Sequence, residues 1–68
     1  MNIEWENAPY LPGAAQRADV GPDRLLVRRT KPYAKTFRGT INGDFVGIWE
    51  DVEEAKRNVE IKFMERAA

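Results

Sequence analysis

The side chains most able to do chemistry in this chain are its arginines and its carboxylates. The 68 residues include no His, Cys or Ser, so the usual general base and the usual activated nucleophiles are missing. The three threonines have no obvious activating partner, and the glycines form no phosphate-binding loop. Four carboxylates between residues 50 and 54 crowd the start of an expected helix, where acids cap free amides and stabilise the positive end of the dipole. We therefore expect a non-enzymatic protein with no metal site, cofactor or small-molecule substrate.

The charges are unevenly distributed, although the formal net charge is zero. Residues 1–23 hold four acids against Arg17 alone, residues 24–43 hold six bases and no acid, and residues 44–68 hold seven acids and four bases. A basic middle is therefore flanked by two acidic ends. The basic segment is either a solvated surface whose charges pair with its neighbours or a surface that binds an anionic partner.

Three strands are predicted to carry the basic segment. Branched residues indicate a strand over residues 24–30, which ends at Lys31-Pro32, and a second over residues 35–41. Asn42-Gly43 is a strong signal for a two-residue hairpin turn, because a type I′ turn needs positive φ at both positions. The third strand then covers residues 44–49.

A C-terminal helix is expected to follow the sheet. Asp51 is its expected N-cap, with Glu54 three residues later in a capping-box arrangement. The buried stripe at helical spacing is Val52, Ala55, Val59 and Phe63. The predicted fold class is α+β: a three-stranded antiparallel sheet backed by one C-terminal helix, over residues 24–68. Residues 1–23 contain three of the four prolines and no sustained period, which predicts an irregular N-terminal arm.

The length and composition indicate one small cytoplasmic domain. A chain of this size buries only about 60% of its unfolded surface. The absence of Cys fits a reducing compartment, and the first ten residues carry acids where a signal peptide needs lysines. No apolar run approaches the ~18 residues that span a bilayer. We expect a soluble protein with no membrane partner.

The two-residue turn sets the expected register of the hairpin. With Ile41 opposite Asp44, Phe37 falls opposite Ile48. This register predicts that Phe37, Val46 and Ile48 form the core that meets the helix. The side chains expected on the opposite face are Thr36, Arg38, Thr40, Phe45 and Trp49, joined by Leu26 and Arg28 of the first strand.

An exposed sheet with arginines and aromatics suits nucleic acid. Guanidinium groups bind phosphates or guanine edges, and flat rings pack against sugars or unstacked bases. The candidate nucleic-acid-binding residues are Arg24, Arg28, Arg29, Lys31, Lys35, Arg38, Phe45 and Trp49. Two alternatives remain open: Trp5, Tyr10 and Leu11 of the arm lie across this face and form a second small core with Phe45 and Trp49, or the face is open and binds a protein.

A second patch is expected on the solvent side of the helix. Ile61 lies about opposite the buried stripe, with Met64 beside it and Arg57 nearby. A lone exposed Ile is ordinary, so the patch is either plain surface or a contact for a partner, a second copy or the folded-back arm. The candidate protein-binding residues are Trp5, Tyr10, Arg57, Ile61 and Met64.

The run "FVGIWEDVEEAKRNVE" resembles the last strand and helix of the plant ethylene-response-factor type of DNA-binding domain. It also resembles the arm-site-binding domain of phage tyrosine integrases. "FRG" at residues 37–39 is similar to the "YRG" of the plant domains. The resemblance implies that a three-stranded sheet enters the major groove of duplex DNA. It places Arg38 and Phe45 at or near contact positions, with Phe45 in place of the usual tryptophan.

Two functional hypotheses follow. The first is a duplex DNA-binding module that uses the basic and aromatic face of the sheet and shows steep salt dependence. The second is a protein-binding inhibitor or accessory factor that acts on a host macromolecular complex and binds in a salt-tolerant way through apolar anchors. The chain is similar in size and in its "EEAK" helix to small phage and prophage proteins, some of which, including anti-CRISPR proteins, inhibit host machinery.

Overall fold

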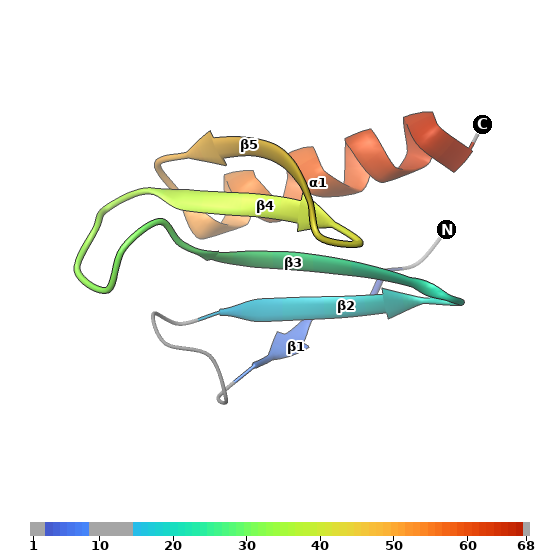
Figure 1. Cartoon of the computed structure of the whole chain (residues 1–68), viewed down its shortest axis with the longest axis horizontal. Helices are drawn as coiled ribbons and strands as arrows, with labels where there is room; N and C mark the ends of the chain where they lie inside the picture. The colour runs from blue at the N-terminus through green and yellow to red at the C-terminus, as the bar shows by residue number, and fades with distance from the viewer. Residues whose placement is uncertain (1–2, 9–14, 68) are drawn as a thin grey trace.

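The fold is a five-stranded antiparallel sheet with one helix behind it (Figure 1). The computed structural model describes residues 3–8 and 15–67. The elements are β1 (Glu6–Asn7), β2 (Gln16–Val20), β3 (Asp23–Arg29), β4 (Phe37–Ile41), β5 (Asp44–Trp49) and α1 (Val52–Ala67). The strands lie in the sheet in chain order. The α+β class with a C-terminal helix is confirmed, but the expectation of three strands is wrong. Two further strands come from residues 1–23, which are therefore not an irregular arm throughout.

The strand β2 joins β3 through the two-residue turn Gly21-Pro22. Gly21 has a φ of 61°, the positive value that the first central residue of a type II′ turn requires and that glycine adopts readily. The resulting register places Ala18 opposite Leu25, and both side chains are buried. The N–H of Ala8 donates to the carbonyl of Ala15 at 2.9 Å and thereby ties β1 to β2.

The helix α1 covers one face of the sheet and forms the core with it. Asp51 is its N-cap, because the Glu54 N–H donates to Asp51 Oδ2 at 3.1 Å. The predicted stripe is confirmed at Ala55, Val59 and Phe63, which are buried, while Val52 packs against them partly exposed. The buried cluster comprises Ala18, Leu25, Val27, Phe37, Ile41, Ala55, Val59 and Phe63.

The β4–β5 hairpin begins as predicted and then changes register. Asn42 and Gly43 have φ of 53° and 87°, and Thr40 lies opposite Phe45. A β-bulge then leaves Val46 without a partner on β4, so that Gly39 lies opposite Gly47 and Phe37 opposite Trp49. An inserted residue moves the following side chains to the other face. The prediction that Ile48 is buried and that Trp49 lies on the outer face is therefore wrong.

The Trp49 ring occupies the helix side of the sheet because two glycines leave room for it. Gly39 and Gly47 are cross-strand partners. A Cβ at Gly47 would lie 2.7 Å from Cη2 of Trp49, and a Cβ at Gly39 would overlap Cγ2 of Val59 on the helix. The Trp49 indole therefore lies directly on the backbone at Gly47, and α1 approaches the backbone at Gly39 through Val59.

Residues 3–5, just before β1, lie on the helix side of the sheet (Figure 1). Trp5 packs against the core, and its Nε1 donates to Oε2 of Glu60 on α1 at 2.6 Å. A second core formed by Trp5, Phe45 and Trp49 on the far face is therefore contradicted. Tyr10 and Leu11, which were expected to share in that core, lie outside the described residues. The outer face, defined as the sheet face away from α1, is not covered by any segment that the structure describes.

Candidate nucleic-acid interface

The outer face carries two arginines side by side. Arg28 of β3 and Arg38 of β4 are directly opposite each other in the register, which places their Cβ atoms about 5 Å apart. Arg38 is exposed and Arg28 is half-buried. Within residues 3–8 and 15–67, no carboxylate forms an ion pair with either guanidinium. Because like charges directly opposite destabilise a sheet, an anion bound between them would relieve the repulsion.

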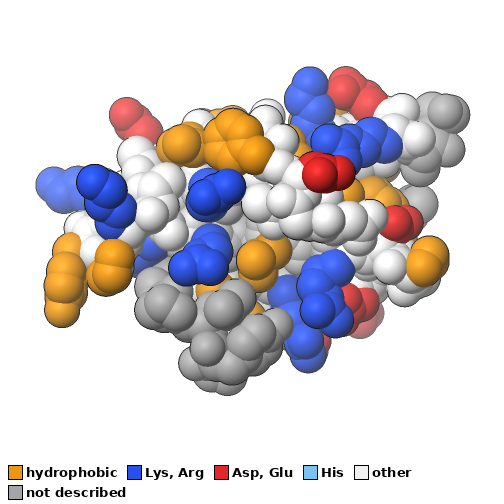
Figure 2. All heavy atoms as spheres, in the orientation of Figure 1, with side chains coloured by type: hydrophobic (Ala, Val, Ile, Leu, Met, Phe, Trp, Pro, Cys, Tyr) orange, Lys and Arg blue, Asp and Glu red, His pale blue; other side chains and the backbone are white. Residues whose placement is uncertain are grey.

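Hydrophobic side chains lie beside the arginine pair. Ile48 of β5 is opposite Arg38 and is 53% exposed. Phe45 is 55% exposed, and Cζ of Arg38 lies 5.3 Å from its ring centroid, within the range of a cation–π contact. Figure 2, drawn from the same side as Figure 1, shows Lys and Arg side chains with hydrophobic ones among them on this side. The Arg38 guanidinium is thus positioned by the Phe45 ring.

The loop between β3 and β4 is closed by paired contacts at its base. The Thr30 N–H donates to the Thr36 carbonyl at 3.0 Å, and the two threonine hydroxyls are hydrogen-bonded at 2.7 Å. Arg29 packs over the Phe37 ring at 4.9 Å and donates from Nη1 to the Ala34 carbonyl at 2.6 Å. Arg29 therefore holds the loop in place, and its side chain accompanies Phe37 instead of joining Arg28 on the outer face.

The loop adds two lysines near the arginine pair. Lys31 and Lys35 are exposed. Lys31 follows the last residue of β3 by two positions and Lys35 precedes the first residue of β4 by two, so both lie at the end of the sheet that holds Arg28 and Arg38. No ion pair engages either lysine in the described part of the chain. Tyr33, between them, is 99% exposed. We call Arg28, Lys31, Lys35 and Arg38 the basic cluster.

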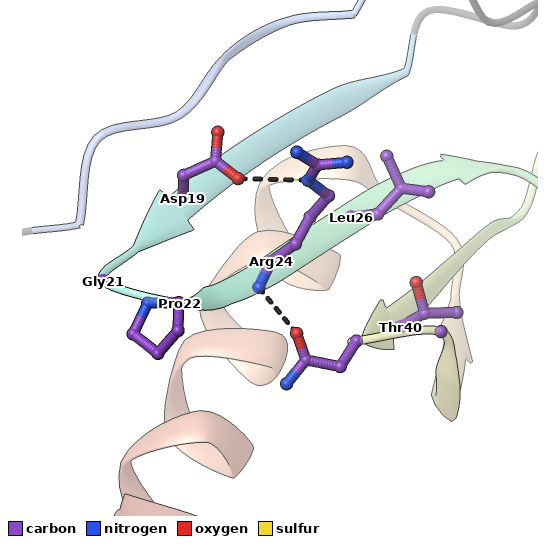
Figure 3. A pocket seen from close by; sticks show the side chains of 8 residues that line it. Asp19, Gly21, Pro22, Arg24, Leu26 and Thr40 are labelled. Atoms are coloured by element: carbon purple, nitrogen blue, oxygen red, sulfur yellow. Dashed lines mark hydrogen bonds and ion pairs between the residues drawn. The ribbon is translucent and has the colours of Figure 1, made fainter.

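One ion pair on the outer face joins β1 to β2 at the level of Leu26, where Nε of Arg17 lies 3.0 Å from Oε1 of Glu6. The end of the outer face opposite the basic cluster is neutralised by a second pair, in which Nε of Arg24 lies 3.1 Å from Oδ1 of Asp19. This end also holds a shallow depression of about 690 Å³ between the two hairpin turns, with Leu26 and Thr40 among its lining residues (Figure 3). The depression is lined by acidic, basic and apolar side chains, whereas no acid among residues 3–8 and 15–67 forms an ion pair with the basic cluster.

Asn42 joins the two turns beside this depression. Its Oδ1 accepts a hydrogen bond from the backbone N–H of Arg24 at 2.9 Å, and its Nδ2 donates to Oδ1 of Asp23 at 2.8 Å. The Asn42 N–H in turn donates to the Arg24 carbonyl at 2.8 Å. These contacts join the start of β3 to the β4–β5 turn at one end of the outer face.

The structure brings together some of the sequence-predicted residues and separates others. The basic cluster and Phe45 share the outer face or the loop at its end. Arg24 lies at the neutralised end, while Arg29 and Trp49 belong to the helix side. Among the candidates for protein binding, Ile61 and Met64 are exposed, at 45% and 43%, and Arg57 is exposed beside them. Trp5 packs against the core and donates a hydrogen bond to Glu60. Tyr10 lies outside the described residues.

Sequence reasoning missed Ile48 and Tyr33 as exposed hydrophobic side chains. Ile48 reaches the outer face only because of the bulge at Val46. No residue type near Val46 in the sequence predicts a bulge there. The pair of glycines at 39 and 47 is the feature that could have indicated it, since a large ring on the same face needs such a gap.

The fold defines a class: a small α+β domain made of a five-stranded antiparallel meander and one helix. No protein-family model matches the sequence, and searches of curated proteins and of solved structures found no match. Among the described residues, no helix is long and apolar enough to cross a membrane, and no group of three or more acidic, His or Cys side chains could hold a metal ion.

Proposed function

We propose that this chain binds nucleic acid, with duplex DNA as the expected ligand, through the outer face of its sheet. The observation that carries the proposal is the cross-strand pair Arg28–Arg38, which no carboxylate neutralises in the part of the chain that the structure describes. A phosphate between the two guanidinium groups would accept charge-assisted hydrogen bonds from both. The repulsion within the pair would then become an attraction for the ligand.

The neighbouring side chains fit the same ligand. The flat face of Phe45 can pack against a sugar or an unstacked base, and the Arg38 guanidinium above it can reach a phosphate or the O6 and N7 atoms of guanine. Lys31 and Lys35 supply further contacts to the phosphate backbone. If all four cations of the basic cluster contact phosphates, the slope of log K against log salt is about −3.6, which is the steepest value that the cluster can give.

The experiment is a fluorescence-anisotropy titration of a labelled 20-base-pair duplex between about 50 and 200 mM salt. We expect Arg38→Glu to weaken binding at least tenfold and to reduce the salt slope by about one. Lys62→Glu is the matched control, because it makes the same change of charge at an exposed position on α1. Equal losses in the two variants would show that only the net charge matters. Unchanged affinity in Arg38→Glu would refute the proposal.

A second candidate function is a protein-binding inhibitor or accessory factor of phage type. It is favoured by Ile61 and Met64, which are 45% and 43% exposed on the helix and lie away from the basic cluster. Apolar anchors of this kind dominate many interfaces. This function predicts a salt-tolerant complex with a protein that survives Arg38→Glu and is lost in Ile61→Asp, the reverse of the pattern expected for nucleic acid.

A further inference from the structure

The strand β5 forms one edge of the sheet, and its free side has no hydrogen-bonded neighbour among the described residues. The strand order ends at β5, and no backbone hydrogen bond outside the β4–β5 ladder reaches it within the described ranges. At the other edge, β1 pairs with part of β2. Natural edge strands are usually protected by Lys, Pro or an inward-pointing charge. Phe45–Trp49 contains none of these, and the β-bulge at Val46, which also discourages pairing, leaves the stretch from Gly47 to Trp49 in regular register.

The exposed side chains of β5 are those that a further strand would cover. Phe45 and Ile48 are 55% and 53% exposed, and cross-strand neighbours pack against such side chains on the same face of a sheet. The bulge at Val46 interrupts the ladder near the start of β5. A partner segment paired here would therefore be short.

The charged residues in β5 and in the segment that follows it are all acidic, while Arg38 of β4 lies beside Phe45 and Ile48 on the outer face. Residues 44–54 carry five carboxylates and no Lys or Arg, so acids lie at both ends of the free edge. Two copies of β5 paired antiparallel about Gly47 would place Asp44 of one copy against Glu50 of the other. Like charges directly opposite are destabilising, so the charge pattern disfavours a second copy and favours a strand with basic ends.

We propose that the β5 edge docks a short extended segment of another protein, apolar at alternate positions and carrying Lys or Arg at its ends. The segment adds to the sheet as a sixth strand, with main-chain hydrogen bonds providing affinity and side-chain contacts providing specificity. The proposal does not rest on nucleic-acid binding, but the docked segment would cover Phe45, which also belongs to the proposed nucleic-acid interface, so the two ligands would exclude each other. The proposal involves a different surface from the Ile61–Met64 patch.

The test uses the full chain labelled with ¹⁵N and a capped peptide, Lys-Val-Thr-Val-Thr-Val-Lys. The control peptide has the same side chains but N-methyl groups on alternate backbone amides, which block strand pairing. We expect the first peptide to shift the amide signals of residues 45–49 and to slow hydrogen exchange at alternate residues of β5. The N-methylated peptide should do neither.

Two variants separate the effect of an acid beside the β5 edge from the effect of the net charge of the protein on a basic peptide. Glu50→Lys reverses a charge beside the edge and is expected to weaken peptide binding about three- to tenfold. Glu65→Lys makes the same change at an exposed position on α1 and is expected to alter binding less than twofold. The spectrum of each free variant reports whether it is folded.

Three outcomes would overturn the proposal. The first is that no signal of β5 moves at millimolar peptide. The second is that the N-methylated peptide binds as well as the parent. The third is that the free chain dimerises with protection of the β5 amides, which would make a second copy the occupant.

Discussion

The contact between the N-terminal segment and the helix can be tested through the Trp5–Glu60 hydrogen bond. The bond is 2.6 Å long, part-buried, and ends on a carboxylate. Hydrogen bonds to charged groups contribute roughly 1.5–3 kcal/mol. Trp5→Phe keeps an aromatic ring but removes the donor, so we expect it to lower the free energy of unfolding by about 2 kcal/mol. For a domain of this size that loss corresponds to a fall in Tm of roughly 8–16 °C.

A double-mutant cycle isolates the contact from the general loss of packing. Trp5→Phe, Glu60→Ala and the double variant are unfolded with urea and followed by far-ultraviolet circular dichroism, which does not depend on the tryptophan that is removed. We expect a coupling free energy of about 1–2 kcal/mol. Glu65→Ala, on the same helix, serves as control and should show coupling to Trp5 of less than about 0.5 kcal/mol.

Additivity of the two substitutions would refute this reasoning. If Trp5→Phe and Glu60→Ala add within about 0.5 kcal/mol, the indole does not reach Glu60. The N-terminal segment would then be free to lie elsewhere, including across the outer face. The consequence extends to function, because the proposed nucleic-acid interface requires that this face remain open.

Two other substitutions test the elements that hold the sheet in shape. Gly39→Ala should lower the free energy of unfolding, measured with urea, by about 1–3 kcal/mol, because the new methyl group overpacks against Val59. The loss should be smaller when Val59 is also replaced by Ala. An equal loss in both backgrounds would contradict the contact. Gly21→Ala should cost roughly 1–2 kcal/mol in the same assay, because its φ is 61° and no atom stands near the new methyl group. A neutral result there would mean that the β2–β3 turn does not need positive φ.

Local signals predicted the features that depend only on neighbouring residues. The Asn42-Gly43 turn follows from the need for positive φ at both positions, and it has those values. Asp51 caps α1 because its side chain can accept from an amide that the helix leaves free. Alternation along β4 likewise predicts Arg38 on the outer face, and the structure has it there, opposite Arg28 and exposed.

Long-range packing decided the features that local signals missed. The bulge at Val46 lets the Trp49 ring enter the core over Gly47, and the gain from burying an indole belongs to the tertiary structure. The sequence of β2 predicts an irregular segment, because it is short, polar and set among prolines, which is typical of an edge strand or a loop. Its place in the sheet depends on pairing with β3, and that pairing is visible only when the Gly21-Pro22 turn is recognised.

The zero net charge of the chain hides two surfaces of opposite sign. Arg17 and Arg24 are matched by acids on the outer face, which leaves the basic cluster at one end and acids at the two ends of the β5 edge, Asp44 and Glu50, with three more at the start of α1. Adjacent strands are about 4.8 Å apart, so Arg38 and the near end of that edge lie within the Debye length of about 10 Å at 0.1 M salt. The acids therefore weaken the attraction of the cluster for phosphate, and added salt screens that repulsion together with the attraction. It follows that the salt slope of nucleic-acid binding should be shallower than the limit of about −3.6 set by counting cations alone.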